Sequence, residues 1–202
     1  MGESGTGKSC SLRNFKNDEV AIINVMSKPL PFRSDIKTYN TDNYVNVYAA
    51  IKKTTRKIIV IDDAQYLMIN EYMERAKETG YQKFTDIGKH FYDLLMNIRE
   101  LPEDTIVYLL AHTQTDESGK ERFKTVGKLM DNYSIEGVCT ICLKTMVDNG
   151  YWFSTENNGQ DTVKAPLAMF PESKIENDLK KVDEIIRNYY GFNNDKKETK
   201  SK

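Results

Sequence analysis

The first nine residues contain the residue types and the spacing of a phosphate-binding loop. Gly2, Gly7, Lys8 and Ser9 satisfy the pattern G-x-x-x-x-G-K-[ST]. In such a loop, small residues let backbone N–H groups approach phosphate oxygens closely. The lysine reaches the β- and γ-phosphates of a nucleotide, and the hydroxyl ligates Mg²⁺. The residues expected to bind the nucleotide are Gly2, Glu3, Ser4, Gly5, Thr6, Gly7, Lys8, Ser9 and Cys10.

A second group that can do this chemistry lies about fifty residues downstream. An apolar β-branched run, Ile58-Ile-Val-Ile, ends in Asp62 and Asp63. A strand with this ending places carboxylates at the edge of the sheet where open α/β folds bind ligands. We expect Asp62 to hold Mg²⁺ through water, together with Ser9. Asp63 is then placed to polarise an attacking water as a general base.

The elements that must position these groups alternate between strand-like and helix-like patterns. This alternation predicts an α/β domain with a largely parallel sheet. Expected strands cover residues 19–25, 56–63, 105–111 and 137–143. Expected helices cover residues 8–15, 42–53, 64–77, 84–100 and 173–190. Asn149-Gly150 predicts a hairpin turn before an antiparallel strand at residues 151–155.

The two motifs together resemble the P-loop NTPases, in the branch that holds RecA-like and AAA-type ATPases. "GESGTGKS" is similar to the Walker A motif and "IIVIDD" to Walker B. In that branch a further strand lies between the two motif strands and ends in a polar sensor. "IVYLLAHTQ" (residues 106–114) matches this layout. The resemblance therefore implies a γ-phosphate contact from Gln114 or Thr113, with His112 as the alternative.

The region after residue 124 is similar to phage-encoded ATP-binding proteins, including Sak4-like single-strand annealing ATPases. It shares a later strand, a hairpin and a T-x-K-x-P-x-x-M-F ending. With the motifs, the resemblance runs from Gly2 to about Phe170. It implies a Mg²⁺-dependent ATPase in phage DNA recombination or replication. The implied partners are ATP and ADP, single-stranded DNA as a candidate, and further copies of the chain in a homo-oligomer.

Two departures from the family pattern bear on catalysis and on the sheet. RecA-like enzymes carry a catalytic glutamate after the second strand, whereas residues 24–29 here contain no acid. The role of base then passes to Asp63, which is one methylene shorter than the glutamate usual in AAA-type proteins. The second departure is that only Met1 precedes Gly2, so the strand that normally leads into the loop is missing. We expect a truncated chain or a loop with a mobile N-terminal end, and a weakened nucleotide affinity in both cases.

Several other residues have both a functional and a plainly structural interpretation. Candidates for a cation supplied to a neighbouring subunit are Arg122, Lys124, Lys128 and Lys144; each fits a solvated surface equally well. Tyr151, Trp152 and Phe153 can stack on bases, but the alternation of a strand favours core packing for one or two of them. Cys139 and Cys142 form a C-x-x-C, which we interpret as structural because a zinc site needs more ligands.

Composition limits the remaining classes of function. With 29 Lys+Arg against 30 Asp+Glu the net charge is −1, which argues against nucleic-acid binding by bulk positive charge. No apolar run is long enough for a membrane span, so we expect a cytoplasmic protein, in the host cytoplasm if it is phage-encoded. We expect a single ATPase domain over residues 1–190 and a polar, disordered tail at 191–202. The alternatives to an ATPase are a nucleotide-gated interaction module with little hydrolysis and a small-molecule or nucleotide kinase.

Overall fold

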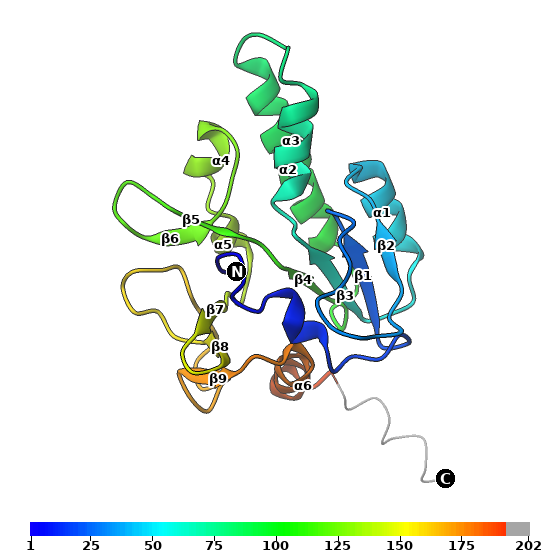
Figure 1. The fold of residues 1–202 in the computed structure, drawn as a ribbon, viewed down its shortest axis with the longest axis vertical. Helices are drawn as coiled ribbons and strands as arrows, with labels where there is room; N and C mark the ends of the chain where they lie inside the picture. Colours follow the sequence, from blue (N-terminus) through cyan, green and yellow to red (C-terminus); the bar gives the residue numbers. More distant parts are fainter. Residues whose placement is uncertain (193–202) are drawn as a thin grey trace.

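A parallel four-stranded sheet forms the centre of the protein, whose structure is a computed structural model that describes residues 1–192. The strand order is β2-β1-β3-β4, and neighbouring strands are parallel throughout (Figure 1). The strands are β1 (Val20–Asn24), β2 (Thr38–Asn40), β3 (Ile58–Asp62) and β4 (Ile106–Leu109). This confirms the expected α/β class and three of the expected strands; β2 is an additional edge strand.

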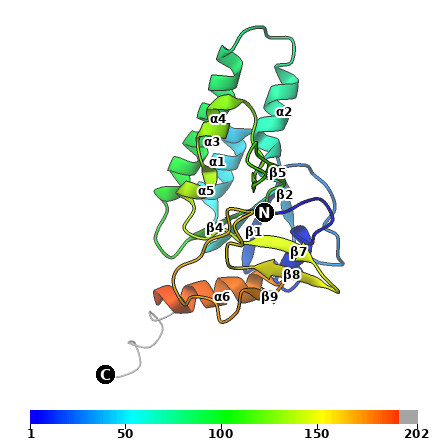
Figure 2. The ribbon, with the colours of Figure 1, turned by 90° about the vertical axis from the view of Figure 1, so that its left-hand side faces the viewer.

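Helices cover both faces of this sheet, as Figures 1 and 2 show. One face carries α1 (Tyr44–Lys53), α2 (Tyr66–Glu74) and α3 (Gln82–Arg99), and the other carries η1 (Ser9–Leu12) and α6 (Leu179–Tyr190). Successive strand residues point to opposite faces, so Ile59 and Ile61 of β3 pack under α1–α3 whereas Val60 packs toward η1 and α6. Two separate cores result, and their strands are apolar on both sides.

The helix boundaries follow from local capping. Asn43 precedes α1, and its side-chain oxygen accepts hydrogen bonds from the N–H groups of Val45 and Asn46. The Asp178 side chain accepts in the same way from the first turn of α6. At its other end α6 is followed by the C-cap Gly191, which has φ +76°. Each cap satisfies N–H or C=O groups that the helix itself leaves unpaired. Because Asn43 and Asp178 are the capping residues, α1 begins at Tyr44 and α6 begins at Leu179. Both starts lie later than the expected starts at residues 42 and 173.

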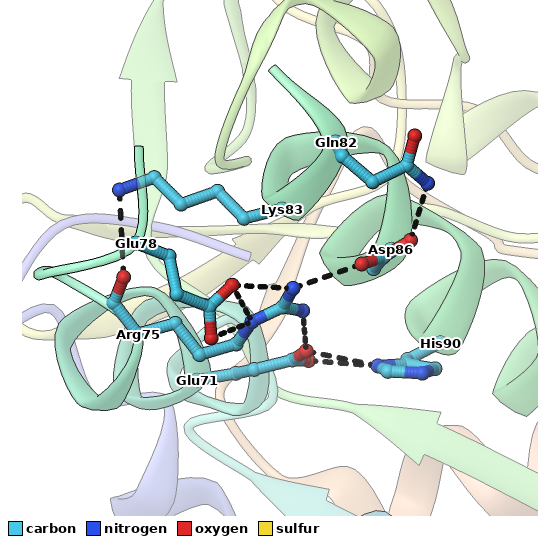
Figure 3. A network of polar contacts seen from close by, with 7 residues as sticks. All are labelled: Glu71, Arg75, Glu78, Gln82, Lys83, Asp86 and His90. Carbon is cyan, nitrogen blue, oxygen red and sulfur yellow. Dashed lines mark hydrogen bonds and ion pairs between the residues drawn. The ribbon is translucent and has the colours of Figure 1, made fainter. Parts of the chain in front are cut away.

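The α2–α3 pair is fixed by one arginine between the two helices. Arg75 forms ion pairs with Glu71, Glu78 and Asp86 at 2.8–3.0 Å. His90 Nδ1 lies 2.9 Å from Glu71 Oε1 and extends the network along α3 (Figure 3). Because α2 follows directly from the Asp62-Asp63 end of β3, this network also fixes the element that leaves the candidate site.

The C-terminal half adds two small antiparallel sheets beside the central one. A hairpin of β5 (Thr113–Thr115) and β6 (Glu121–Phe123) follows β4. The short helices α4 (Lys128–Asn132) and α5 (Ile135–Val138) come next. The second sheet contains β7 (Lys144–Val147), β8 (Tyr151–Ser154) and β9 (Lys174–Glu176). The predicted turn at Asn149-Gly150 joins β7 and β8, and Asn149 adopts a positive φ of 48°.

Three expected elements differ in the structure. The helix expected at residues 8–15 is only the four-residue 3₁₀ turn η1, because Phe15 leaves the helical path to pack in the core beside α6. The strand expected at 137–143 is wrong: Ser134 caps α5, and the strand starts at Lys144. The helix expected from residue 173 begins at Leu179, because residues 174–176 form β9.

The correction at residues 137–143 also changes the surroundings of the two cysteines. Cys142 is buried and Cys139 half-buried, and neither is in a disulfide. A hydrogen bond between the two side chains lowers the pKa of Cys139, and raises that of Cys142. The two cysteine side chains therefore lie close together.

Met1 and Gly2 link the central sheet to the C-terminal one. Gly2 N donates to Ala111 O at 3.1 Å, just beyond β4. Met1 N donates to Leu143 O at 2.8 Å, and Met1 O accepts from Thr145 N at 2.8 Å. The first residues of the loop are thus hydrogen-bonded on both sides.

Two further expectations concern the termini and the membrane. A disordered tail is expected at residues 191–202. Of this tail, residues 193–202 lie outside the residues that the structure describes. Within residues 1–192, none of the helices combines the length and apolar character that crossing a membrane requires.

Candidate functional site

The loop of residues 2–10 depends on two glycines where other chain segments approach closely. A Cβ on Gly2 would lie 2.0 Å from Thr145 Oγ1, and a Cβ on Gly7 would lie 2.9 Å from Tyr151 Cδ1. Gly7 also has φ +94°, a conformation that other residues rarely adopt. Thr6 Oγ1 shares a 2.6 Å hydrogen bond with Thr145 Oγ1. The β7–β8 hairpin therefore supports the loop and fixes its shape.

Part of the loop backbone has unused hydrogen-bond donors. Gly2 N–H is bonded to Ala111 O and Thr6 N–H to Glu3 O. Within the described residues, the N–H groups of Gly5, Gly7 and Lys8 have no hydrogen-bond partner. Unpaired N–H groups in a tight loop are suited to an anion.

The side chain of Lys8 folds back into this loop. Its Nζ donates to Gly2 O at 2.8 Å and to Glu3 O at 2.7 Å. The residue is only 6% exposed. Burial lowers the pKa of Lys8, while the carboxylates of Asp63 and Asp62 oppose that shift. The ammonium group therefore lies within the loop and close to the two acids at the end of β3.

Ser9 and Asp62 join the two motifs that the sequence separates. Ser9 Oγ donates to Asp62 Oδ1 at 3.0 Å. Burial raises the pKa of Asp62 to about 6, although the hydrogen bond from Ser9 lowers it. The resulting pair offers a hydroxyl and a carboxylate oxygen at the carboxyl end of a parallel strand.

This pair has the donor chemistry that Mg²⁺ prefers. Mg²⁺ takes oxygen ligands and is usually held by one or two protein groups together with phosphates and water, rather than by an all-protein cage. In the described part of the chain, no cluster of three or more His, Cys, Asp or Glu side chains is arranged for a metal. Ser9 and Asp62 therefore fit a magnesium ion that arrives with a nucleotide.

Asp63, the expected base, lies between the ammonium of Lys28 and the imidazole of His112. Its Oδ2 lies 3.2 Å from Lys28 Nζ, and its Oδ1 lies 3.4 Å from His112 Nε2. Asp63 has φ 60°, a left-handed conformation that aspartate tolerates better than most residues. The turn points the carboxylate out of the end of β3 and leaves it 14% exposed.

The three residues considered as sensors, His112, Thr113 and Gln114, make different contacts. His112 follows β4, pairs with Asp63, and donates its backbone N–H to Gln65 Oε1 at 3.2 Å. Burial and the charge of Lys8 lower the pKa of His112. Thr113 begins β5, and the amide of Gln114 donates to Thr125 Oγ1 at 3.2 Å. His112, the alternative in the sequence analysis, is thus the one that contacts Asp63.

The other basic candidates are distributed over the β5–β6 hairpin and beyond it. Lys144 Nζ is 2.8 Å from Glu121 Oε1, so this ammonium already has a partner. Arg122 lies opposite Gln114 in the hairpin, and the backbone of Lys124 is bonded to His112 O at 3.0 Å. Lys128 is the first residue of α4. A supply of charge to another subunit by any of them stays a prediction.

The three adjacent aromatic residues of β8 have different surroundings. Tyr151 is 50% exposed and lies against Gly7, while Phe153 is buried in the core. Trp152 donates Nε1–H to Asp148 O at 2.9 Å, and Lys174 lies over its ring. Only Tyr151 of the three therefore borders the loop.

Sequence reasoning missed residues that reach the site from elsewhere in the chain. Lys28 comes from the connection after β1, Thr145 from β7 and Gln65 from the start of α2. The position of Lys28 just after the carboxyl end of a parallel strand was an available signal. Its pairing with Asp63, however, follows only from the structure.

Comparison with known protein families finds no family model that matches the chain, and no curated protein matches it. The site must therefore be interpreted from its own geometry.

Proposed function

We propose that this protein binds a nucleoside triphosphate, ATP in the first instance, with Mg²⁺ in the loop of residues 2–10, and hydrolyses it. The observation that carries the proposal is the 3.0 Å hydrogen bond from Ser9 Oγ to Asp62 Oδ1. It joins a hydroxyl of the loop to the acid that ends β3, across 53 residues of sequence. The buried ammonium of Lys8 beside them adds the positive charge that a triphosphate needs.

The proposed fold family is that of the RecA-like and AAA-type P-loop NTPases. The placement of β4 supports it, because β4 pairs with β3 on one side. On the other side, Ala111 O accepts from Gly2 N, so the segment after β4 runs between the Asp62 strand and the start of the loop. This is the layout that the resemblance implies for a sensor strand.

Each residue has a definite role in the proposed reaction. Ser9 and Asp62 would hold Mg²⁺, which would supply positive charge to the phosphates. Lys8 and the unpaired loop N–H groups stabilise charge on the β- and γ-phosphates. Asp63 accepts a proton from the attacking water as the water oxygen bonds to the γ-phosphorus. The bond to the diphosphate oxygen breaks, and the products are the nucleoside diphosphate and phosphate.

One observation favours a second candidate, a nucleotide-gated module with little turnover. Lys28 and His112 contact the two carboxylate oxygens of Asp63, so both oxygens already have partners where an attacking water would bind. A base held in this way hydrolyses slowly unless nucleotide binding changes its partners. The two candidates share the binding step and differ only in the rate of phosphate release.

Calorimetric titration of the full chain with ATP tests the binding step. We expect binding in Mg²⁺, weaker binding in EDTA, and none for Lys8→Ala. Lys57→Ala is the control, because Lys57 pairs with Asp104 at the other end of the sheet. Unchanged ATP affinity in Lys8→Ala would remove the phosphate-loop hypothesis.

Phosphate release, measured with and without single-stranded DNA, tests the rest of the proposal. Release stimulated by DNA supports an ATPase that acts in phage DNA recombination or replication. ATP binding without release supports the nucleotide-gated module. Release that is independent of DNA supports hydrolysis alone and argues against the role on DNA.

A further inference from the structure

The connection after β1 is built so that a lysine lies beside the candidate base. Asn24, the last residue of β1, is 4% exposed, and its Nδ2 donates to Lys28 O at 2.6 Å. Ser27 N donates to Asn24 O, and Ser27 adopts φ 54° to make the turn. A non-glycine residue with positive φ costs energy, so the surrounding contacts must hold the turn in place.

The side chain of Lys28 is exposed enough to reach another partner. Its side chain is 58% exposed, whereas the Asp63 carboxylate that it contacts is 14% exposed. The ammonium also lies 5.5 Å from the centre of the Tyr66 ring. An exposed lysine pair is worth little, at most about 1 kcal/mol, so a better anion nearby can displace Asp63.

The charge of Lys28 also acts on the rest of the site. Burial is the main cause of the lowered pKa of Lys8 and of His112, and the charge of Lys28 lowers both pKa values further. Lys28 therefore lies in the same electrostatic environment as Lys8 and as His112, the other residue that contacts Asp63. Two carboxylates, Asp62 and Asp63, face the charges of Lys8 and Lys28.

We propose that Lys28 is a cation for the terminal phosphate, supplied within the same chain, which leaves Asp63 when a triphosphate binds. This inference rests on the proposed nucleotide site. A γ-phosphate carries more negative charge than a carboxylate and attracts the ammonium from its pair with Asp63. The exchange adds positive charge at the terminal phosphate and frees one oxygen of Asp63 for water. Lys28 therefore distinguishes a triphosphate from a diphosphate and couples binding to activation of the base.

The experiment compares the Kd of ATP with the Kd of ADP, both with Mg²⁺, for wild type, Lys28→Met and Lys28→Arg. The loss of a charged contact predicts that Lys28→Met weakens ATP binding about tenfold and leaves ADP binding unchanged. Lys28→Arg should keep most of the preference for ATP. Lys57→Met is the matched control, a surface lysine whose partner Asp104 lies away from the site. Retained ADP binding also shows that the Met variant is folded.

The outcomes separate this inference from the proposed function. Wild-type protein that binds neither nucleotide overturns both. Wild-type binding with the same ATP-to-ADP ratio in Lys28→Met overturns the role of Lys28 alone. An equal loss of ATP and ADP affinity also overturns it, because it indicates a structural effect on the whole loop.

Discussion

Tyr108 of β4 donates its hydroxyl hydrogen to Asp183 of α6, with an oxygen–oxygen distance of 2.7 Å. Arg187 Nε donates to the other oxygen of Asp183 at 2.6 Å, and Asp183 is only 2% exposed. Burial and the nearby carboxylate raise the pKa of Tyr108 well above its usual value, so the phenol stays protonated and donates. This buried contact fixes α6 to the sheet, on the face that also carries η1.

Asp183→Ala should therefore destabilise the protein strongly. Removing the carboxylate leaves the Arg187 guanidinium and the Tyr108 hydroxyl without their partner in a buried place. Such a loss costs about 3–5 kcal/mol in the free energy of unfolding. Chemical denaturation measures it, with Glu184→Ala as a control on the exposed side of the same helix. Equal stability of the two variants would show that the loss of Asp183 does not leave an uncompensated charge in the interior.

The Arg75 network predicts a defined pH dependence. Hydrogen bonds from Arg75 lower the pKa of Glu78 and of Asp86, and Gln82 and His90 on α3 act on Asp86 in the same direction. A lowered folded-state pKa gives stability that is present above the unfolded pKa and is lost as the pH falls through the folded value. Arg75→Met should lower Tm at pH 7, and the difference from wild type should shrink toward about pH 3.

The control for this pH series is Arg99→Met on α3. Arg99 Nη1 contacts the Met96 sulfur at 3.8 Å instead of the carboxylates of the network. The difference in Tm between Arg99→Met and wild type should not vary with pH. A Tm difference for Arg75→Met that stays constant from pH 7 to pH 3 would show that the arginine acts through packing.

Gly2→Ala tests whether the start of the loop depends on its close approach to β7. The added Cβ would lie 2.0 Å from Thr145 Oγ1, so the loop or β7 must move. Overpacking of this kind costs about 1–3 kcal/mol, and we expect lower ATP affinity as well as a lower Tm. The double variant Gly2→Ala/Thr145→Ala removes the clashing atom and should recover part of the loss. No recovery would place the defect elsewhere in the loop.

Much of the fold could be predicted because its signals are local. The β-branched run of β3 and the apolar face of α3 each indicated the right element. The segment at residues 137–143 misled, because its apolar residues fit a strand while Ser134 caps a helix just before it. The site followed the same rule. Ser9 and Asp62 were found from motifs, whereas the Lys28–Asp63 pair depends on a turn that brings together residues 35 apart.

Ser9→Ala tests the magnesium contact. Removing the hydroxyl takes away one oxygen ligand and leaves the backbone of the loop intact. We expect about a tenfold loss of ATP affinity in Mg²⁺ and little change in EDTA. Ser173→Ala, which shortens an exposed side chain just before β9, should match wild type in both conditions. An equal loss with and without Mg²⁺ would point to a distorted loop.

Asp63→Asn separates binding from turnover. Asparagine has nearly the shape of aspartate and tolerates the left-handed φ of 60° at this position, so the turn should survive. It cannot accept the proton of the attacking water, and general base catalysis typically contributes about 10²–10⁴-fold. We expect kcat for phosphate release to fall by about this factor while ATP still binds. Asp104→Asn, a half-buried acid paired with Lys57 away from the site, is the control. Normal turnover in Asp63→Asn would show that another group, with His112 the nearest choice, takes the proton.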